Sequence, residues 1–248
     1  MGAALLLLTP LVASAAEMKV LSAGALKAPL VELVAQFERT TSHKVTVVYG
    51  TAGTVRALLE KGEKADLLIL PAEGIAEAEG RGFAQPGTRA DLAAVAIGIA
   101  VRNGVPMPHI RTPEALKRTL LDATAVAYVD PTRGTSGRHF DSVVLPALGI
   151  ANEVRAKAKL QTEGSAAELV RRGEADIAIQ QVSELLFVDG VTVVGLLPDS
   201  LQKITTYSAT LMSGATAPEA ARELISFLTS PAAKRVFKAK GMDATPGT

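Results

Sequence analysis

Short apolar runs alternate with stretches of helical periodicity along most of this chain. Residues 18–22 and 44–49 are rich in apolar and β-branched side chains, which is typical of strands, and each run ends in a turn of small residues. Between them, apolar residues recur every three or four positions from Leu26 to Phe37, which predicts an amphipathic helix. Strands that alternate with helices in this way predict an α/β fold with parallel pairing in its sheets.

The same alternation continues to the end of the chain. The apolar run 125–129 predicts a buried strand, and Thr112 followed by Pro113 predicts the start of a helix over 113–121, because threonine caps helices and proline is tolerated at the first helical position. The other predicted strands cover residues 65–70, 92–101, 159–162, 176–180, 191–196 and 204–212. The other predicted helices cover residues 54–61, 140–148, 166–172, 218–229 and 231–240.

Two stretches of the sequence, 58–67 and 169–177, resemble each other. Each ends a predicted helix at a glycine and continues through an acidic residue and Ala-Asp into a strand, with one residue inserted in the first copy. The repeat indicates two similar α/β lobes; a chance match in a chain rich in alanine, glycine and glutamate is the alternative. In the two-lobe hypothesis, the apolar runs 93–101 and 204–212 carry the chain from one lobe to the other.

The first sixteen residues, MGAALLLLTPLVASAA, predict a signal peptide that is cleaved near Ala15 or Ala16. The apolar run is too short to span a bilayer, and it has no lysine or arginine before it, so a buried helix is the alternative. We therefore expect an exported, periplasmic protein. After a signal peptide at 1–16, the expected division is a first lobe formed by 17–97 with 207–248 and a second lobe formed by 98–206.

Composition argues against several classes of function. A net charge of +1, 4% aromatic residues and no tryptophan argue against a nucleic-acid-binding surface, which needs a basic face and stacking rings. The absence of cysteine excludes disulfides and thiolate chemistry, and three scattered histidines argue against a histidine metal cluster, with metal ligation by carboxylates as the alternative. We expect neither a metal nor a cofactor. With 248 residues, of which 48% are hydrophobic, the chain is long enough for two cores.

The turn DPTRGTSGRH at 130–139 is the strongest candidate for a functional motif. It follows the predicted strand 125–129 and opens a predicted helix, so its backbone N–H groups are free to point at a ligand above the turn. Arg133 and Arg138 add positive charge to these donors, which suits an anion. A solvated loop with two surface arginines is the alternative.

With these features, the chain resembles the periplasmic substrate-binding proteins of type II topology, and among them the molybdate-binding family. The resemblance rests most on GTAGT at 50–54, GEKAD at 62–66, the Asp-Pro turn at 130–131 and SPAA at 230–233. It implies a two-lobed α/β fold in which each lobe is a mixed, mainly parallel sheet flanked by helices. The lobes would close like a hinge on a small anion bound in the cleft between them. We also expect a monomer that delivers its ligand to an ABC-type permease.

The resemblance also shows where this sequence departs from the family. In molybdate binders the first two turns each supply a serine hydroxyl and a tyrosine completes the cage; here Ala25 and Ala52 stand at the serine positions, and Gln181 or Gln180 at the tyrosine position. A buried oxyanion that lacks these donors is costly, which disfavours molybdate. The arginines instead favour an organic di- or tricarboxylate. The residues predicted to bind the ligand are Gly24, Ala25, Thr51, Ala52, Gly53, Arg133, Thr135, Ser136, Arg138, Ser165 and Gln181.

An enzymatic function remains open beside simple binding. Aconitate isomerase, an exported enzyme that interconverts the cis and trans forms of a tricarboxylate, is built on the same scaffold. Such a reaction needs a base that removes a methylene proton and a donor that returns a proton elsewhere. His139 and Glu163 are the candidates here, although a histidine in the first turn of a helix is more often a surface residue. No known catalytic signature appears in the sequence, so the hypothesis of a binding protein is preferred.

Overall fold

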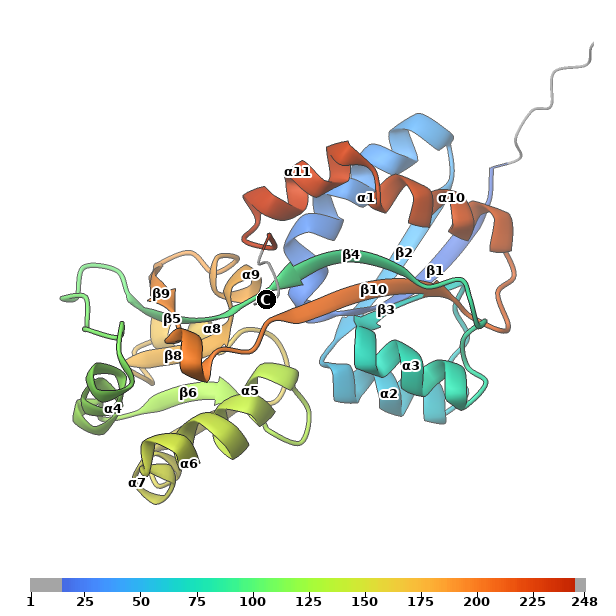
Figure 1. Ribbon diagram of the computed structural model, residues 1–248. Coiled ribbons are helices and arrows are strands. Elements are labelled where there is room, and N and C mark those ends of the chain that lie inside the picture. Colours follow the sequence, from blue (N-terminus) through green and yellow to red (C-terminus); the bar gives the residue numbers. More distant parts are fainter. Residues whose placement is uncertain (1–14, 244–248) are drawn as a thin grey trace, which may run out of the picture.

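The computed structural model describes residues 15–243, and it consists of two lobes that lie side by side (Figure 1). The predicted signal peptide lies almost entirely outside the described residues. No helix among those described combines the length and the apolar character needed to cross a bilayer.

The first lobe is built on a sheet whose strand order is β2-β1-β3-β10-β4. β1 pairs in parallel with β2 and β3, whereas β10 pairs antiparallel with β3 and β4. The strands are β1 (Glu17–Ala23), β2 (Lys44–Gly50), β3 (Leu67–Pro71), β4 (Ala90–Val95) and β10 (Thr205–Leu211). α1 (Lys27–Thr41), α10 (Pro218–Leu228) and α11 (Pro231–Ala239) cover one face of this sheet, and α2 (Ala52–Glu60) and α3 (Ala72–Gly80) cover the other (Figure 1).

The second lobe repeats this layout with the order β7-β6-β8-β5-β9. β6 pairs in parallel with β7 and β8, and β5 pairs antiparallel with β8 and β9. The strands are β5 (Ile97–Arg102), β6 (Val126–Val129), β7 (Ala158–Gln161), β8 (Ile177–Gln181) and β9 (Val191–Leu196). The helices are α4 (Pro113–Asp122), α5 (Thr135–His139), α6 (Leu145–Leu148), α7 (Ala151–Arg155), α8 (Ala167–Arg171) and α9 (Val182–Leu185). The two sheets are mixed and flanked by helices, so the predicted two-lobed α/β fold is confirmed.

The sequence repeat has a structural counterpart. Gly62 and Gly173 follow α2 and α8, both with a positive φ (79° and 76°), and the chain then enters β3 and β8. Asp66 accepts hydrogen bonds from the backbone N–H groups of Lys19, Thr216 and Ala217, and thereby joins β1 and the start of α10 to β3. Asp176, at the equivalent place, accepts hydrogen bonds from the N–H groups at 124 and 125.

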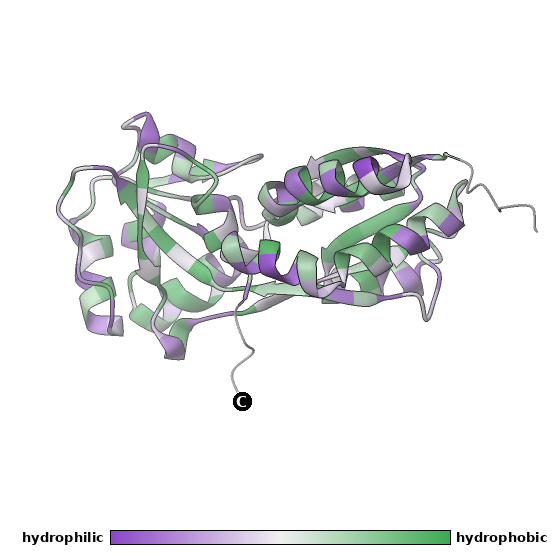
Figure 2. Cartoon of the chain, turned by 90° about the horizontal axis from the view of Figure 1, so that it is seen from above, coloured by the Kyte–Doolittle hydropathy of each residue, from purple (hydrophilic) through white to green (hydrophobic). Residues whose placement is uncertain are grey.

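Each lobe has its own core of buried aliphatic and aromatic residues. Phe37 and Phe237 are fully buried in the first lobe, and Tyr128 packs edge-on against Phe140 in the second, with ring centroids 5.0 Å apart. Figure 2 shows the hydrophobic colouring on the strands and the hydrophilic colouring on the outer surfaces of the helices. Burial of one such side chain stabilises the fold by about 1.5–3 kcal/mol.

The chain passes between the lobes through two short segments. β4 belongs to the first sheet and β5 to the second, with only Ala96 between them, and the chain returns between β9 and β10. The sequence predicts one strand over 92–101, which is wrong, because the run is apolar throughout and periodicity does not show the change of sheet. The helix predicted at 140–148 is the second half of a longer one that begins at α5 and contains a π turn over Phe140–Val144. α3, α7 and α9 were not predicted.

Candidate functional site

Three helix N-termini meet at a small cavity between the lobes, which we call the central chamber. In each case a strand ends and a helix begins: β1 leads through a 3-10 turn (Gly24–Leu26) into α1, β2 leads into α2, and β6 leads into α5. The first N–H groups of a helix have no carbonyl partner within it, so these three N-termini offer donors and positive potential to the chamber. The chamber measures about 30 Å³ and is lined by Ala23, Gly24, Ala25, Thr51, Ala52, Val129, Gly134, Thr135, Ser136, Gln181, Glu184 and Tyr207.

Close packing fixes the turn before α5. A Cβ on Gly137 would lie 1.8 Å from the carbonyl oxygen of Val129, and one on Gly134 would lie 2.3 Å from the Val129 side chain. Only glycine therefore lets α5 begin so close to the end of β6. At the other turn, the Thr51 hydroxyl caps α2 by accepting a hydrogen bond from the N–H of Thr54 at 3.1 Å.

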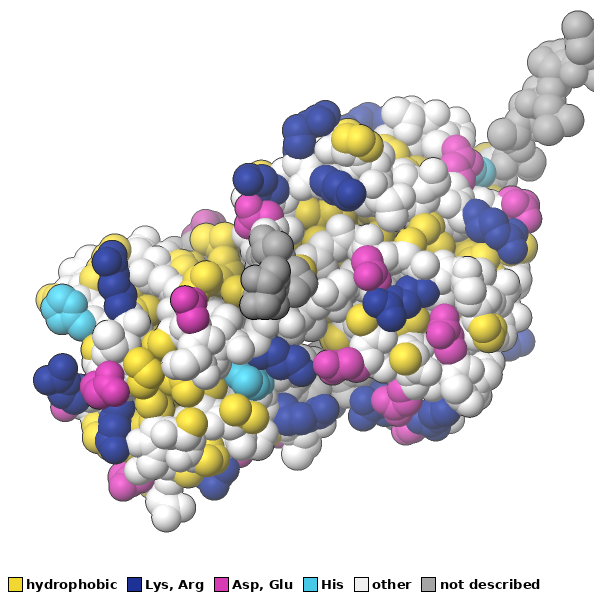
Figure 3. Space-filling model, viewed as in Figure 1, with side chains coloured by type: hydrophobic (Ala, Val, Ile, Leu, Met, Phe, Trp, Pro, Cys, Tyr) yellow, Lys and Arg dark blue, Asp and Glu magenta, His cyan; other side chains and the backbone are white. Residues whose placement is uncertain are grey.

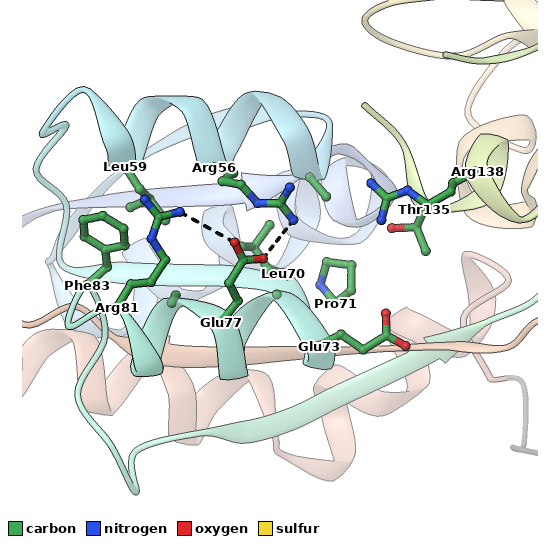
Figure 4. Close-up of a pocket in the computed structure, with 13 residues that line it drawn as sticks. Arg56, Leu59, Leu70, Pro71, Glu73, Glu77, Arg81, Phe83, Thr135 and Arg138 are labelled. Carbon is green, nitrogen blue, oxygen red and sulfur yellow. Dashed lines mark ion pairs between the residues drawn. The ribbon is translucent and has the colours of Figure 1, made fainter. Parts of the chain in front are cut away.

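A larger cavity of about 170 Å³, which we call the arginine cavity, adjoins the central chamber and shares Ala52 and Thr135 with it. It lies between α2 and α3. Arg56 and Arg138 line it, and Figure 4 shows Arg138 reaching from the second lobe toward the end where Arg56 lies. Arg56 is paired with Glu77 at 2.9 Å.

A third cavity of about 330 Å³, which we call the Lys27 cavity, adjoins the chamber on another side and shares Gly24, Thr51 and Glu184 with it. Lys27 Nζ lies 5.5 Å from the ring centroid of Phe187, a residue of the second lobe. Tyr49 also lines this cavity, and burial raises its pKa to about 12, so its phenol is neutral.

Glu184 lies at the junction of the central chamber and the Lys27 cavity. Its Oε1 is 3.3 Å from the position that a Cβ on Gly24 would take, so the carboxyl reaches from α9 to the first turn of the other lobe. Burial raises the pKa of Glu184 to about 8, and Gln180 acts in the opposite direction. The site therefore contains a carboxyl group that changes charge near neutral pH.

Tyr207 and Gln181 complete the wall of the chamber beside Glu184. The Tyr207 hydroxyl donates a hydrogen bond to Gln181 Oε1 at 2.6 Å, and both side chains are buried. Burial, followed by the nearby Glu184 carboxyl, raises the pKa of Tyr207 well above its usual range. Gln181 Nε2 is buried and has no hydrogen-bond partner among residues 15–243. A buried amide without a partner is a donor available to a ligand.

The structure brings most of the predicted ligand-binding residues together. The central chamber is lined by Gly24, Ala25, Thr51, Ala52, Thr135, Ser136 and Gln181. Ser165 lines the Lys27 cavity, and Arg138 lines the arginine cavity. Ser165 and Arg138 therefore line cavities that adjoin the chamber and do not line the chamber itself.

Gly53 and Arg133 form a direct contact between the lobes. Gly53 N–H donates to the Arg133 carbonyl at 2.9 Å, and a Cβ on Gly53 would lie 3.0 Å from Arg133 Cα. The Arg133 guanidinium lies 3.6 Å from Glu163, which also accepts a hydrogen bond from the Thr54 hydroxyl across the cleft. Arg133 therefore helps to hold the lobes together, and its charge is partly neutralised by Glu163. Figure 3 shows charged side chains gathered where the two lobes meet.

Of the two residues predicted to catalyse an isomerisation, Glu163 lines a cavity of the site and His139 does not. Glu163 lines the Lys27 cavity and is bound to Thr54 and Arg133. His139 Nε2 lies 2.8 Å from the carbonyl oxygen of Leu201 and lines none of the three cavities described above.

Sequence reasoning missed Glu184 and Tyr207. Glu184 lies on a helix of a single turn, too short to produce a periodic pattern, and Tyr207 lies within a predicted strand where a tyrosine is an ordinary core residue. The polar run Gln180-Gln181 at the end of a buried strand was the available signal. In the part of the chain that the structure describes, no three acidic or histidine side chains converge to hold a metal ion.

Comparison with known proteins identifies the family. The family model described as bacterial extracellular solute-binding protein matches residues 18–243. The chain belongs to this family. The chain is also 32% identical over 253 residues to aconitate isomerase from Pseudomonas sp, and the match covers 99% of this chain and 95% of that protein.

Solved structures agree with the fold of this solute-binding family. The periplasmic molybdate-binding protein of Azotobacter vinelandii superposes with a TM-score of 0.78 at 20% identity and covers 92% of this chain and 100% of its own. The sulfate-binding protein SubI from Mycobacterium tuberculosis H37Rv gives a TM-score of 0.75 at 16% identity and covers 92% of this chain and 86% of its own. At these identities the likeness concerns the fold.

Proposed function

We propose that this protein is exported to the periplasm and binds a small organic polycarboxylate between its lobes. One carboxylate of the ligand sits in the central chamber and accepts hydrogen bonds from the N–H groups of Ala25, Ala52 and Ser136. A second carboxylate extends into the arginine cavity, where Arg138 pairs with it. The ligand bridges the two lobes and holds them closed, in a form that an ABC-type permease would recognise.

The position of the arginine cavity directly beside the central chamber carries this proposal. The chamber alone has a volume of about 30 Å³, which suits one small anionic group, while the adjoining cavity adds about 170 Å³. A bare tetrahedral oxyanion would leave the larger space and Arg138 unused. The side chains of Ala25 and Ala52 also have no hydroxyl to donate to such an ion. An extended ligand with two or three carboxylates uses both spaces.

A thermal-shift screen of the purified protein tests this function. The panel is citrate, tricarballylate, cis-aconitate and trans-aconitate against molybdate, tungstate and sulfate. A ligand present at 100 times its Kd stabilises the folded state by about 2.7 kcal/mol, which is a shift of several degrees in Tm. We expect shifts with the polycarboxylates, reduced in Arg138→Ala and retained in Arg222→Ala, a surface control paired with Glu219. Shifts with molybdate alone contradict the proposal.

A second candidate function is the isomerisation of an unsaturated polycarboxylate. Glu184 favours it, because a binder of anions gains little from an acidic side chain in its cleft, whereas an isomerase needs a group that accepts a proton near neutral pH. The relative named aconitate isomerase, aligned over nearly the whole chain, supports the same reaction class. Incubation of the protein with cis-aconitate, followed by detection of the trans isomer, distinguishes this enzyme from a binding protein.

A further inference from the structure

The geometry points to Glu184 as the residue that removes and returns the proton during isomerisation of an unsaturated polycarboxylate in this cleft. The inference rests on the proposed function and assigns the chemistry of the site to one side chain. It differs from the expectation from sequence, which placed this role on His139 or Glu163.

Glu184 is held at the wall of the cleft. Glu184 lines both the central chamber and the Lys27 cavity. A ligand that is anchored in the chamber and extends toward the Lys27 cavity therefore lies beside the Glu184 carboxyl. The helix that carries it is fixed, because the Ser165 hydroxyl donates to the backbone carbonyl of Glu184 at 3.1 Å and the N–H of Val182 donates to Ala96 at 3.1 Å. A general base must be held within hydrogen-bond reach of the proton it takes, and this helix holds the carboxyl at the wall of the cleft.

The neighbouring titratable groups are less suited to take a proton than Glu184. The charged or titratable groups that face the same two cavities are Lys27 from α1, Tyr49 from β2, Tyr207 from β10, and Glu163 and Glu168 from the second lobe. Tyr207 is a buried neutral phenol that already donates to Gln181, so it is a poor base. Glu163 is bound to Thr54 and Arg133, and Glu168 is paired with Arg171 at 2.7 Å. Glu184 forms no ion pair among the described residues, and its carboxyl is therefore available.

The reaction balances without any other reagent. An aconitate-type substrate has a methylene carbon and a double bond that share the central carbon. The Glu184 carboxylate takes one proton from the methylene carbon, and the electron pair of that C–H bond spreads over the three-carbon unit and the adjoining carboxylate. The carboxylic acid then gives a proton to the former vinylic carbon at the other end. The old double bond becomes single, a new one forms on the other side of the central carbon, and Glu184 is regenerated.

The chamber is suited to stabilise the intermediate. Negative charge builds up on the substrate as the proton leaves, and donors fixed beforehand around that charge lower the barrier. The helix N-termini at Ala25, Ala52 and Ser136 supply such donors, and Gln181 Nε2, unpartnered among the described residues, supplies another. These donors are already in place before the proton moves.

The test uses the full chain with cis-aconitate in D2O, followed by proton NMR for cis–trans conversion and for deuterium uptake at carbon. Calorimetric titration with tricarballylate, which has no double bond, measures binding separately. The variants are Glu184→Gln, which keeps size and hydrogen bonding but does not accept the proton, Glu184→Asp, and the control Glu174→Gln, whose exposed carboxyl pairs with Arg172. We expect Glu184→Gln to lose at least 100-fold in conversion rate while its Kd changes less than about fivefold. Glu184→Asp should keep a reduced rate, and Glu174→Gln the full rate.

Three results would count against the inference. Conversion that survives in Glu184→Gln shows that another group moves the proton. Wild-type protein that binds tricarballylate but neither converts cis-aconitate nor introduces deuterium shows that Glu184 has no catalytic role, while the binding function stands. Failure of the wild-type protein to bind any polycarboxylate removes the proposed function itself and the inference with it.

Discussion

Tyr207 and Gln181 join the two lobes at the wall of the central chamber: the phenol hydroxyl on β10 donates a hydrogen bond of 2.6 Å to the amide oxygen at the end of β8. This bond fixes the orientation of the Gln181 amide, and the N–H₂ group on its other side is left without a partner among residues 15–243. The fold therefore presents a buried donor to whatever enters the chamber.

Replacement of Tyr207 by phenylalanine should weaken both the fold and ligand binding. The variant leaves the Gln181 carbonyl oxygen without its donor in a buried site, which costs about 1–3 kcal/mol in the free energy of unfolding. Urea denaturation measures this loss, and calorimetry with tricarballylate measures the accompanying loss of affinity. Tyr49→Phe is the control for stability, because the Tyr49 hydroxyl makes no hydrogen bond to another described residue. Equal stability of Tyr207→Phe and wild type would show that the bond contributes nothing.

Asp66 should be among the most sensitive polar positions in the first lobe. Its buried carboxylate accepts hydrogen bonds from the N–H groups of Lys19, Thr216 and Ala217. Burial raises the pKa of Asp66, but the hydrogen bonds lower it by more than burial raises it. The pKa of Asp66 therefore lies below its usual value. Asp66→Ala leaves several buried donors unpaired, and we expect a loss of about 3 kcal/mol in the free energy of unfolding. Asp176→Ala, at the equivalent but exposed position of the second lobe, should lose less.

Glu184 should make the stability of the free protein depend on pH. Its pKa is about 8 in the folded state, above the ordinary 4.5, so between these values the folded protein keeps a proton that the unfolded chain releases. The stabilising contribution is therefore fully present below pH 4.5 and is lost as the pH rises toward 8. Glu184→Gln removes this dependence. We expect the variant to become more stable than wild type by about 2 kcal/mol or more at pH 8, and by little at pH 5, in urea denaturation at each pH. A difference that does not change with pH would place Glu184 in an ordinary, solvated environment.

Gly53→Ala should prevent full closure of the lobes. The new Cβ would lie 3.0 Å from Arg133 Cα and 3.1 Å from its carbonyl oxygen, so the contact between the lobes must open. We expect affinity for tricarballylate to fall about tenfold while each lobe keeps its stability, and small-angle scattering in the presence of ligand should show a larger radius of gyration than for wild type. Gly80→Ala is the matched control, because nothing lies within 4 Å of its added Cβ. Wild-type affinity in Gly53→Ala would show that this contact is not part of the closed form.

The two-lobed fold could be predicted from sequence because its evidence is local and repeated. Buried strands such as β3 and β6 form uninterrupted apolar runs, and Thr112 caps α4 as the sequence indicates, with its hydroxyl 3.2 Å from the N–H of Ala115. The break at Ala96 could not be predicted, because its two neighbours, Val95 and Ile97, are both apolar and fully buried although they belong to different sheets.

The candidate site could be predicted only in part. Turns of small residues marked the places where helix N-termini face the chamber, since a strand followed by glycine and a helix is visible in the sequence. The environment of Glu184 and the pairing of Arg133 with Glu163 depend on how the two lobes meet, which involves residues far apart in the chain. Spacing along the sequence does not contain that information.

Calorimetric titration of the wild-type protein with tricarballylate and with molybdate in the same buffer tests the central claim most directly. The adjoining chamber and arginine cavity predict that tricarballylate binds at one site per chain at least ten times more tightly than molybdate, and that Arg138→Ala removes most of this preference. Tighter binding of molybdate, with tricarballylate unable to compete, would contradict it.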